Sequence, residues 1–388
     1  MPLTRRTTLA LLGGGVVFAA DLIRARAVLA QSGGDPTAPW FTAGTGETEP
    51  RRRALSYAIL APNPHNRQPW LVALEGDDTL VLSCDLERRL PETDPFDRQI
   101  TIGLGCFTEL LALAAAEQGL SAEVTPFPEG EPAARLDGRP VARIRLLPGG
   151  AADPLFRQVL DRRSNKAPYA MDRPVAAESL GLIAGAAIHG SRIDGSVAAD
   201  RVAAIRDLAI RGMEVEMTTP RTAMESVDLL RIGQAAVTAS PDGIDLTGPM
   251  IEDLAQRGIL TREALAAEVE SGAQGPLYGQ MMHFTIEPMR ATPAYLWQLS
   301  GGNTRRDQFA AGRDYVRLNL MATALDLGLH PQSQTLQEFA AMTPLRTEMA
   351  ALLAGDSGHT VQMLCRLGYG PEVPPSPRWP AETRIITA

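Results

Sequence analysis

The stretch APNPHNRQPW, residues 61–70, gathers hydrogen-bonding side chains on a segment that suits neither a helix nor a strand. Its three prolines restrict the backbone, so we expect an ordered loop. Asn63, Asn66 and Gln68 offer amide groups, and Trp70 closes the stretch with a large apolar side chain. The loop is therefore either a surface turn with a hydrophobic anchor or a stiff platform that presents amide edges to a polar ligand. The surface turn is the commoner arrangement, so the rest of the chain has to separate the two.

A second candidate for binding chemistry is the run DRRSNK at 161–166. Arg162 can make bidentate contacts to a phosphate, Ser164 can donate from its hydroxyl, and Lys166 adds a point charge. Taken alone, this short basic run fits a solvated charged turn as well as a phosphate-binding turn.

The composition excludes several classes of protein. The chain of 388 residues has a net charge of −8, and no run mixes clustered basic and aromatic side chains, so nucleic acid is not an expected partner. Five histidines and three widely spaced cysteines argue against a metal centre and against a disulfide framework. A hydrophobic content of 45% and a charged content of 21% are typical of a folded, soluble protein.

The first thirty residues differ from the rest. Arg5 and Arg6 precede a weakly apolar run at 9–20, which is too short to span a bilayer comfortably. This pattern is typical of a twin-arginine export signal over 1–30 and predicts a location in the periplasm or cell envelope. Whether the signal is cleaved or kept as an anchor is left open by its sequence. A linker rich in Gly, Pro and Thr follows at 31–50.

Two parts of the chain share a pattern that indicates an internal repeat. Apolar residues recur with helical spacing over 107–114 and again over 318–325. Each of these expected helices is followed by a strand-like segment, VARIRLL at 141–147 and VQMLCRL at 361–367. The pattern predicts one α+β body built from two related halves, although chance helical periodicity could produce part of it.

The expected organisation has a first unit at 51–150 and a second at 151–380. Within the second unit, a segment at about 212–300 is rich in Met, Thr, Pro and Gly and matches neither half. We expect this segment to be an insertion, partly helical at about 251–270, that lies across a site as a lid.

The two polar clusters, taken together, resemble motifs of the FMN-dependent nitroreductase family. Arg-x-Ser-x-Lys stands at 162–166, and Pro-x-x-x-Asn-x-Gln-Pro-Trp occupies 62–70. Phrases at 291–315, 327–339 and 364–380 resemble the long branch in which two nitroreductase-like units are fused in one chain. The resemblance implies a nitroreductase-like α+β fold arranged as a pseudo-dimer, and therefore a monomer with one FMN per chain.

The resemblance also implies a set of cofactor-binding residues. Arg162, Ser164 and Lys166 would hold the FMN phosphate and ribityl chain, with Arg378 as a second phosphate ligand. Asn66 and Gln68 would face the isoalloxazine or its ribityl side. The complete implied set is Arg162, Ser164, Lys166, Asn63, Asn66, Gln68, Ser333, Gln334 and Arg378, with no metal.

The implied activity is an oxidoreductase that moves electrons from a small-molecule donor through FMN to an electron-poor acceptor, either nitroaromatic or quinone-like. Because reduced nicotinamide is scarce outside the cytoplasm, a flavin-sequestering stress protein stands as the alternative. A scaffold that has lost flavin is a third, weaker possibility. The only export partner expected is the twin-arginine machinery.

Other side chains carry weaker signals. His65 and His330 are candidates for proton donors near the flavin, although structural hydrogen bonding in a loop is the commoner role for each. The GLG run at 103–105 lacks the strand-before, helix-after context of a dinucleotide fingerprint, so we interpret it as helix punctuation. Cys106 lies on an apolar helix face and is expected in the core.

Overall fold

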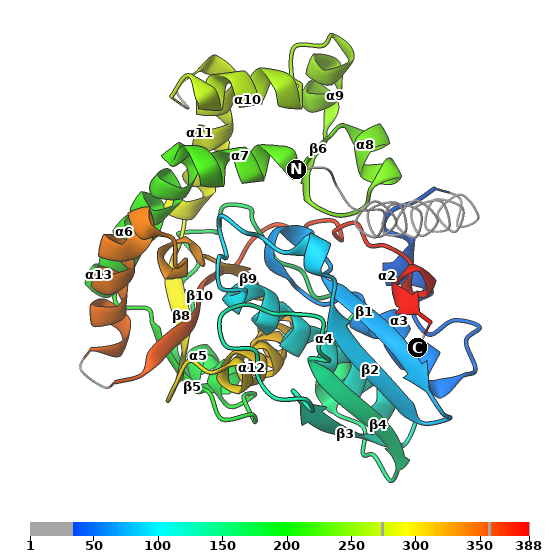
Figure 1. The fold of residues 1–388 in the computed structure, drawn as a ribbon. Helices are drawn as coiled ribbons and strands as arrows, with labels where there is room; N and C mark the ends of the chain where they lie inside the picture. The colour runs from blue at the N-terminus through cyan, green and yellow to red at the C-terminus, as the bar shows by residue number, and fades with distance from the viewer. Residues whose placement is uncertain (1–33, 273–274, 356–357, 388) are drawn as a thin grey trace, which may run out of the picture.

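A computed structural model describes residues 34–272, 275–355 and 358–387. The predicted twin-arginine signal lies outside these residues. Two sheets, antiparallel apart from one edge strand, are each packed on one long helix, and the two helices cross each other in the centre (Figure 1). The first sheet has the order β11 (Ile385–Ile386), β1 (Trp70–Glu75), β2 (Thr79–Cys84), β4 (Ala142–Pro148) and β3 (Leu120–Pro126). The second has the order β5 (Arg192–Ser196), β8 (Ala294–Ser300), β10 (Thr360–Gly368) and β9 (Gly328–Pro331).

The two sheets share one topology. Four strands of the first sheet have the spatial order β1-β2-β4-β3, and all neighbouring pairs are antiparallel. The order β5-β8-β10-β9 in the second sheet is equivalent, again with antiparallel neighbours throughout. In both, the long helix connects the second strand along the chain to the third. This correspondence agrees with the order of elements that the sequence predicted for two related halves, and the strands predicted at 141–147 and 361–367 are β4 and β10.

The central helices, α4 (Arg98–Ala116) and α12 (Arg305–Ala324), approach each other at two glycines. A Cβ on Gly105 would collide with the carbonyl group of Phe309, and one on Gly312 would collide with the carbonyl of Ile102. The prediction that the GLG run only punctuates a helix is therefore wrong. Its glycines lie inside α4, where the lack of a side chain allows the two halves to pack closely.

Helix α4 is long and apolar enough to cross a membrane, and it is the single such helix among the described residues. However, 89% of its apolar stretch is buried inside the protein. Its apolar character follows from its place in the main hydrophobic core, between the first sheet and α12. We therefore interpret α4 as a core helix.

A segment of helices is inserted between β5 and β8, so it starts and ends earlier than the predicted 212–300. Most of its helices form an arc above the sheets (Figure 1) and enclose a hydrophobic cluster of their own. The expected helix at 251–270 is two helices, separated by a turn in which Gly258 has a φ of +69°. The inserted elements are α6 (Ala199–Thr218), α7 (Pro220–Asp228), β6 (Leu230–Ile232), α8 (Gln234–Ala239), β7 (Ile244–Leu246), α9 (Pro249–Gln256), α10 (Arg262–Glu270) and α11 (Pro276–Arg290).

The first half of α6 and helix α13 (Thr343–Ala354) cover the face of the second sheet that points away from α12. The described part of the predicted linker, 34–50, is packed against the body, with Trp40 of α2 (Ala38–Thr42) buried. After β10 the chain returns to the first half, where β11 pairs in parallel with β1. The remaining helices are α3 (Pro50–Ala58), α5 (Ala177–Ala184) and the 3-10 turns η1 (Pro64–Asn66), η2 (Leu86–Arg88), η3 (Pro154–Gln158), η4 (Gln334–Leu336), η5 (Ala340–Met342) and η6 (Ala381–Arg384).

Candidate functional site

A cavity of about 580 Å³ lies where the two halves, the C-terminal tail and the insertion meet. Its volume is in the range of small-molecule and cofactor sites. The loop before β1 forms part of its wall, together with the segment after η3 and the loop that contains η4. Eight of the nine predicted cofactor-binding residues line it: Asn63, Asn66, Arg162, Ser164, Lys166, Ser333, Gln334 and Arg378. Residues more than 300 positions apart in sequence are therefore brought to one cavity.

The loop at 61–70, here called the amide loop, is held in an unusual backbone conformation. His65, Asn66 and Gln68 all have left-handed φ values, of 47°, 49° and 50°. Such values are uncommon outside glycine and persist where surrounding contacts determine the backbone. Asn63 provides one of these contacts, because its Oδ1 accepts a hydrogen bond from the Gln68 backbone N–H at 2.7 Å. Trp70 is fully buried beneath the loop and packs on Phe107, with ring centroids 5.1 Å apart.

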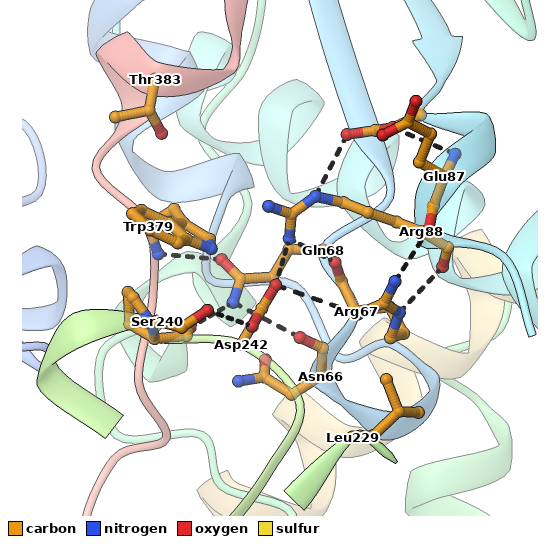
Figure 2. Close-up of polar contacts among 12 residues, drawn as sticks. Asn66, Arg67, Gln68, Glu87, Arg88, Leu229, Ser240, Asp242, Trp379 and Thr383 are labelled. Atoms are coloured by element: carbon orange, nitrogen blue, oxygen red, sulfur yellow. Dashed lines mark hydrogen bonds and ion pairs between the residues drawn. The ribbon is translucent and has the colours of Figure 1, made fainter. Parts of the chain in front are cut away.

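The amide side chains of this loop bind protein groups. Asn66 donates from Nδ2 to the Pro377 carbonyl at 3.0 Å and accepts at Oδ1 from Arg378 Nη1 at 2.6 Å. Gln68 does not line the cavity: it is fully buried and donates to the Pro241 carbonyl at 2.6 Å. Its Oε1 accepts from the Trp379 backbone N–H at 2.9 Å (Figure 2). Gln68 thus departs from its expected position facing a ring and instead ties the loop to the insertion and the tail.

A cluster of ion pairs fastens the insertion to the amide loop. Asp242 of the insertion accepts from Arg88 Nη1 at 2.7 Å and lies 4.0 Å from Arg67 Nη1 (Figure 2). It also accepts from Arg231 Nη2 at 2.7 Å. Burial raises the pKa of Asp242, but Arg88 and Arg231 outweigh it and lower the pKa to about 2. We call Asp242 and its three arginines the clasp. Arg67 also donates to backbone carbonyls of 87 and 88, which accounts for its large side chain in this loop.

Two buried arginines form one end of the cavity. Arg162 uses Nη2 to donate to the Leu60 carbonyl at 2.8 Å, whereas its Nε and Nη1 are buried without a hydrogen-bond partner. Arg378 also has a buried, unpartnered Nε. Burial lowers the pKa of Arg162 to about 10, and burial together with the Arg162 charge lowers the pKa of Arg378 to about 9. Neither guanidinium forms an ion pair with an acidic side chain of the described residues, so this end of the cavity is suited to an anion.

Trp40 supports this basic end from the N-terminal segment, a role that the sequence did not predict. Its buried ring lies 5.4 Å from the Arg162 guanidinium and 5.5 Å from that of Arg378. Arg163 stacks on the same ring at 4.7 Å. Cation–π contacts of this kind stabilise guanidinium groups that have left water. The tryptophan thereby offsets part of the cost of holding like charges together.

Both candidate histidines line the cavity as neutral groups. Burial, with Lys166 and Arg67 nearby, lowers the pKa of His65 to about 4. Burial and the Arg366 charge lower the pKa of His330 well below its ordinary value. Because Arg366 Nε donates to His330 Nδ1 at 3.0 Å, the proton of this neutral imidazole is on Nε2. His330 is therefore fixed as a hydrogen-bond donor.

The cavity has further polar residues that sequence reasoning missed. Gln99 of α4 accepts at Oε1 from the Ser333 hydroxyl at 3.1 Å, and Glu216 of α6 contributes a buried carboxyl. Neither residue belongs to a local motif, because each is a single polar residue on a largely apolar helix face. Most of the lining residues from the insertion are apolar and form an apolar wall: Met213, Met217, Leu230, Ile244, Leu246, Met250, Ile251, Leu254, Leu260, Leu277, Tyr278, Met281, Phe284 and Met289.

Comparison with known proteins finds distant relatives that are named as nitroreductases. No protein-family model matches it. It is 25% identical over 355 residues to a protein of Mycobacterium tuberculosis named Putative NAD(P)H nitroreductase, a match that spans 87% of this chain and 93% of the relative. A second relative from that organism, Putative NAD(P)H nitroreductase acg, is 32% identical over 127 residues. That match covers 32% of this chain and only 37% of the relative's length.

Solved structures of nitroreductases give partial likenesses. A protein from Anabaena variabilis, described as a putative nitroreductase, has a TM-score of 0.41 at 13% identity, over 80% of this chain and 82% of that one. The FMN-dependent nitroreductase NfnB from Mycobacterium smegmatis, solved with NADPH, has a TM-score of 0.33 at 15% identity. That likeness covers 55% of this chain and 86% of the NfnB chain.

Proposed function

We propose that this chain is an FMN-dependent oxidoreductase of the nitroreductase-like class and binds one FMN in the described cavity. The observation that carries the proposal is the pair Arg162 and Arg378, two buried cations that line the cavity with unpartnered N–H groups. A buried guanidinium without an anion is unfavourable, and a phosphate group would satisfy these donors with charge-assisted hydrogen bonds. The residues present therefore fit a phosphorylated cofactor.

In this proposal the phosphate of FMN is held by Arg162, Arg378, Ser164 and Lys166. The amide loop and the Ser333–Gln334 turn contact the rest of the cofactor. Gln68 acts behind the loop, because its side chain bonds Pro241 and Trp379. When bound, FMN supplies the capacity to accept a hydride from a donor and to reduce an electron-poor acceptor such as a nitroaromatic or a quinone.

The chain's own residues provide binding, orientation and exclusion of water. The apolar wall of the insertion lowers the dielectric constant on that side of the cavity, which strengthens the electrostatic interactions inside it. Cations at the basic end favour an anionic ligand. His330 presents a fixed N–H donor, since Arg366 occupies its other ring nitrogen. The equivalent strand orders of the two sheets support a pseudo-dimer within one chain and hence a functional monomer.

The clasp favours one rival role. Because Asp242 of the insertion pairs with Arg88 and lies near Arg67 of the amide loop, the insertion is held over the cavity, as expected of a protein that stores flavin without turnover. Anaerobic addition of NADH or NADPH separates the two roles. Bleaching of the bound flavin, followed by reoxidation on addition of a quinone or nitroaromatic acceptor, supports the oxidoreductase. A flavin that neither donor bleaches, and that dithionite bleaches without acceptor-dependent reoxidation, supports sequestration.

We also propose export to the periplasm or cell envelope by the twin-arginine route, from the pattern around Arg5 and Arg6. Lysine at both positions keeps the charge and removes the arginine pair. The double variant R5K/R6K is expected to accumulate in the cytoplasm, with flavin still bound, when cell fractions are compared by immunoblot. Unchanged export of that variant would contradict this route.

A further inference from the structure

Glu216 has a buried carboxyl group in the wall of the cavity. Its acidic character contrasts with the two arginines of the basic end. It comes from α6 and is only 4% exposed. Gln337 donates from Nε2 to its Oε2 at 2.6 Å, which fixes the carboxyl group against the loop after η4. Asp245, the other acidic residue that lines the cavity, is exposed. Glu216 is therefore the one buried acid among the described lining residues.

No cation of the described residues compensates Glu216. The groups that act on its charge are Gln337 and Gln334, which stabilise the ionised form, and Glu225, which opposes it. Burial is the dominant effect and raises the pKa of Glu216 to about 7. A carboxyl that is buried beside apolar side chains is normally paired with a cation. Here a bound ligand would have to supply that cation.

The surroundings of Glu216 specify the rest of such a ligand. Met213 and Met217 flank it along α6, and Tyr278 of α11 lines the same cavity. Methionine side chains are adaptable and make favourable contacts with aromatic rings. Phe284 and Met250, both more than half exposed, continue the apolar surface outward. The insertion side of the cavity thus combines an apolar surface with a single buried acid, since its second acid, Asp245, is exposed.

We propose that this compartment binds an apolar molecule carrying one protonated amine, and that Glu216 binds the ammonium group and so determines which acceptors are used. The inference rests on the proposed function in so far as it names the class of acceptor. Binding itself requires only the cavity. An acceptor with an amine at one end would be oriented with its ammonium at Glu216 and its remaining part free to extend toward the cofactor end.

Two titratable side chains, Glu225 and Tyr278, are neighbours of Glu216. Glu225 of α7 lies near, but it accepts hydrogen bonds from Glu92 N at 2.8 Å and from Thr93 N at 3.0 Å. Tyr278 of α11 also faces Glu216, and burial raises the pKa of its hydroxyl. Tyr278 stays neutral between about pH 5 and 9. Between about pH 5 and 9, we therefore expect the change of charge in this part of the cavity to come from Glu216.

The test is calorimetric binding of a matched, redox-inert pair of probes, 1-naphthylmethylamine and 1-naphthylmethanol, to the full chain as purified. The amine is protonated throughout the range used, and the alcohol is its neutral counterpart. Titrations at about pH 8.5 and about pH 5.5 place Glu216 in its ionised and protonated forms. The variants are Glu216→Gln, which removes the charge with little change of shape, and Glu214→Gln, its matched control on the exposed face of α6.

For the wild-type chain at the higher pH, we expect the amine to bind at least about tenfold more tightly than the alcohol. The preference is expected to fall below about threefold at the lower pH, because protonation removes the carboxylate charge. Glu216→Gln should abolish the preference, and Glu214→Gln should keep it. Equal affinities in the wild type, absence of binding of both probes, or a preference that survives in Glu216→Gln would each overturn the inference.

The wild-type pH comparison needs no variant, so a folding defect in Glu216→Gln cannot hide the result. The absorbance of the same samples reports whether flavin is present. An amine preference in a protein that carries no flavin and takes up no added FMN would refute the proposed function and leave the binding site standing. A flavin-loaded protein without the preference would refute the amine site alone.

Discussion

Replacing Arg162 by methionine tests the basic end of the cavity. In the free protein this guanidinium is buried, has two unpartnered nitrogens and makes a single hydrogen bond, to the Leu60 carbonyl. Methionine has a similar length and removes the charge. With FMN bound, the lost contacts are one or two charge-assisted hydrogen bonds, together worth about 3 kcal/mol. We therefore expect FMN to bind roughly 100-fold more weakly.

The same change has an opposite expected effect on the free protein. Each buried donor without a partner costs about 1–3 kcal/mol, so Arg162→Met should leave the unfolding free energy of the flavin-free chain unchanged or slightly higher. The lowered pKa of Arg162 has the same cause, since burial penalises the charged guanidinium. A site residue whose removal weakens ligand binding without destabilising the free protein is typical of a group held ready for a ligand.

The assay is titration of the flavin-free chain with FMN and with riboflavin, followed by quenching of flavin fluorescence. Riboflavin lacks the phosphate, so its affinity should change less than about threefold in the variant. Arg163→Met is the matched control, because Arg163 also stacks on Trp40 but lies outside the cavity lining. An equal loss for both ligands, or an unchanged FMN affinity, would refute the assignment of Arg162 to a phosphate.

Three further changes have expected outcomes. Trp40→Leu should lower the unfolding free energy by about 2–3 kcal/mol and weaken FMN binding about threefold to tenfold, because the ring supports Arg162 and Arg378. Denaturant titration measures the first effect, and quenching of flavin fluorescence measures the second. Asp242→Asn should cost about 3 kcal/mol at neutral pH. Because the folded pKa is below the unfolded one, this contribution is present above about pH 4 and is lost as the pH falls towards 2, so thermal unfolding of wild type and variant should converge in acid. Gly312→Ala should destabilise the protein by several kcal/mol, since its Cβ meets a backbone carbonyl of α4, whereas Gly301→Ala on an open surface should not.

The sequence predicted the main elements because each half has strong local patterns. The alternation in VARIRLL and VQMLCRL indicated β4 and β10, and the helical spacing of apolar residues indicated α4 and α12. The clustering of Arg162, Ser164 and Lys166 in one short run, and of Asn63 and Asn66 in another, drew attention to five cavity residues. The family resemblance added the other three, Ser333, Gln334 and Arg378. These patterns lie within short segments, so they can be interpreted without knowledge of the tertiary contacts. Proline and charged side chains restrict the conformations and positions that such segments can adopt.

Features that depend on contacts between distant segments were not predictable. Gln68 has the residue type of a ligand contact, yet its partners are Pro241 and Trp379, which no sequence spacing reveals. The packing role of the GLG run depends on where α12 crosses α4. Likewise, the described part of the predicted linker resembles a flexible segment in composition, but Trp40 is buried against Arg162 and Arg378, which lie far apart in the sequence.

The most direct test is the absorption spectrum of the purified chain, with any released chromophore identified and quantified by mass spectrometry. The account predicts a flavin spectrum and about one FMN per chain, because one basic end is formed by Arg162 and Arg378. A colourless protein that fails to take up added FMN would contradict it.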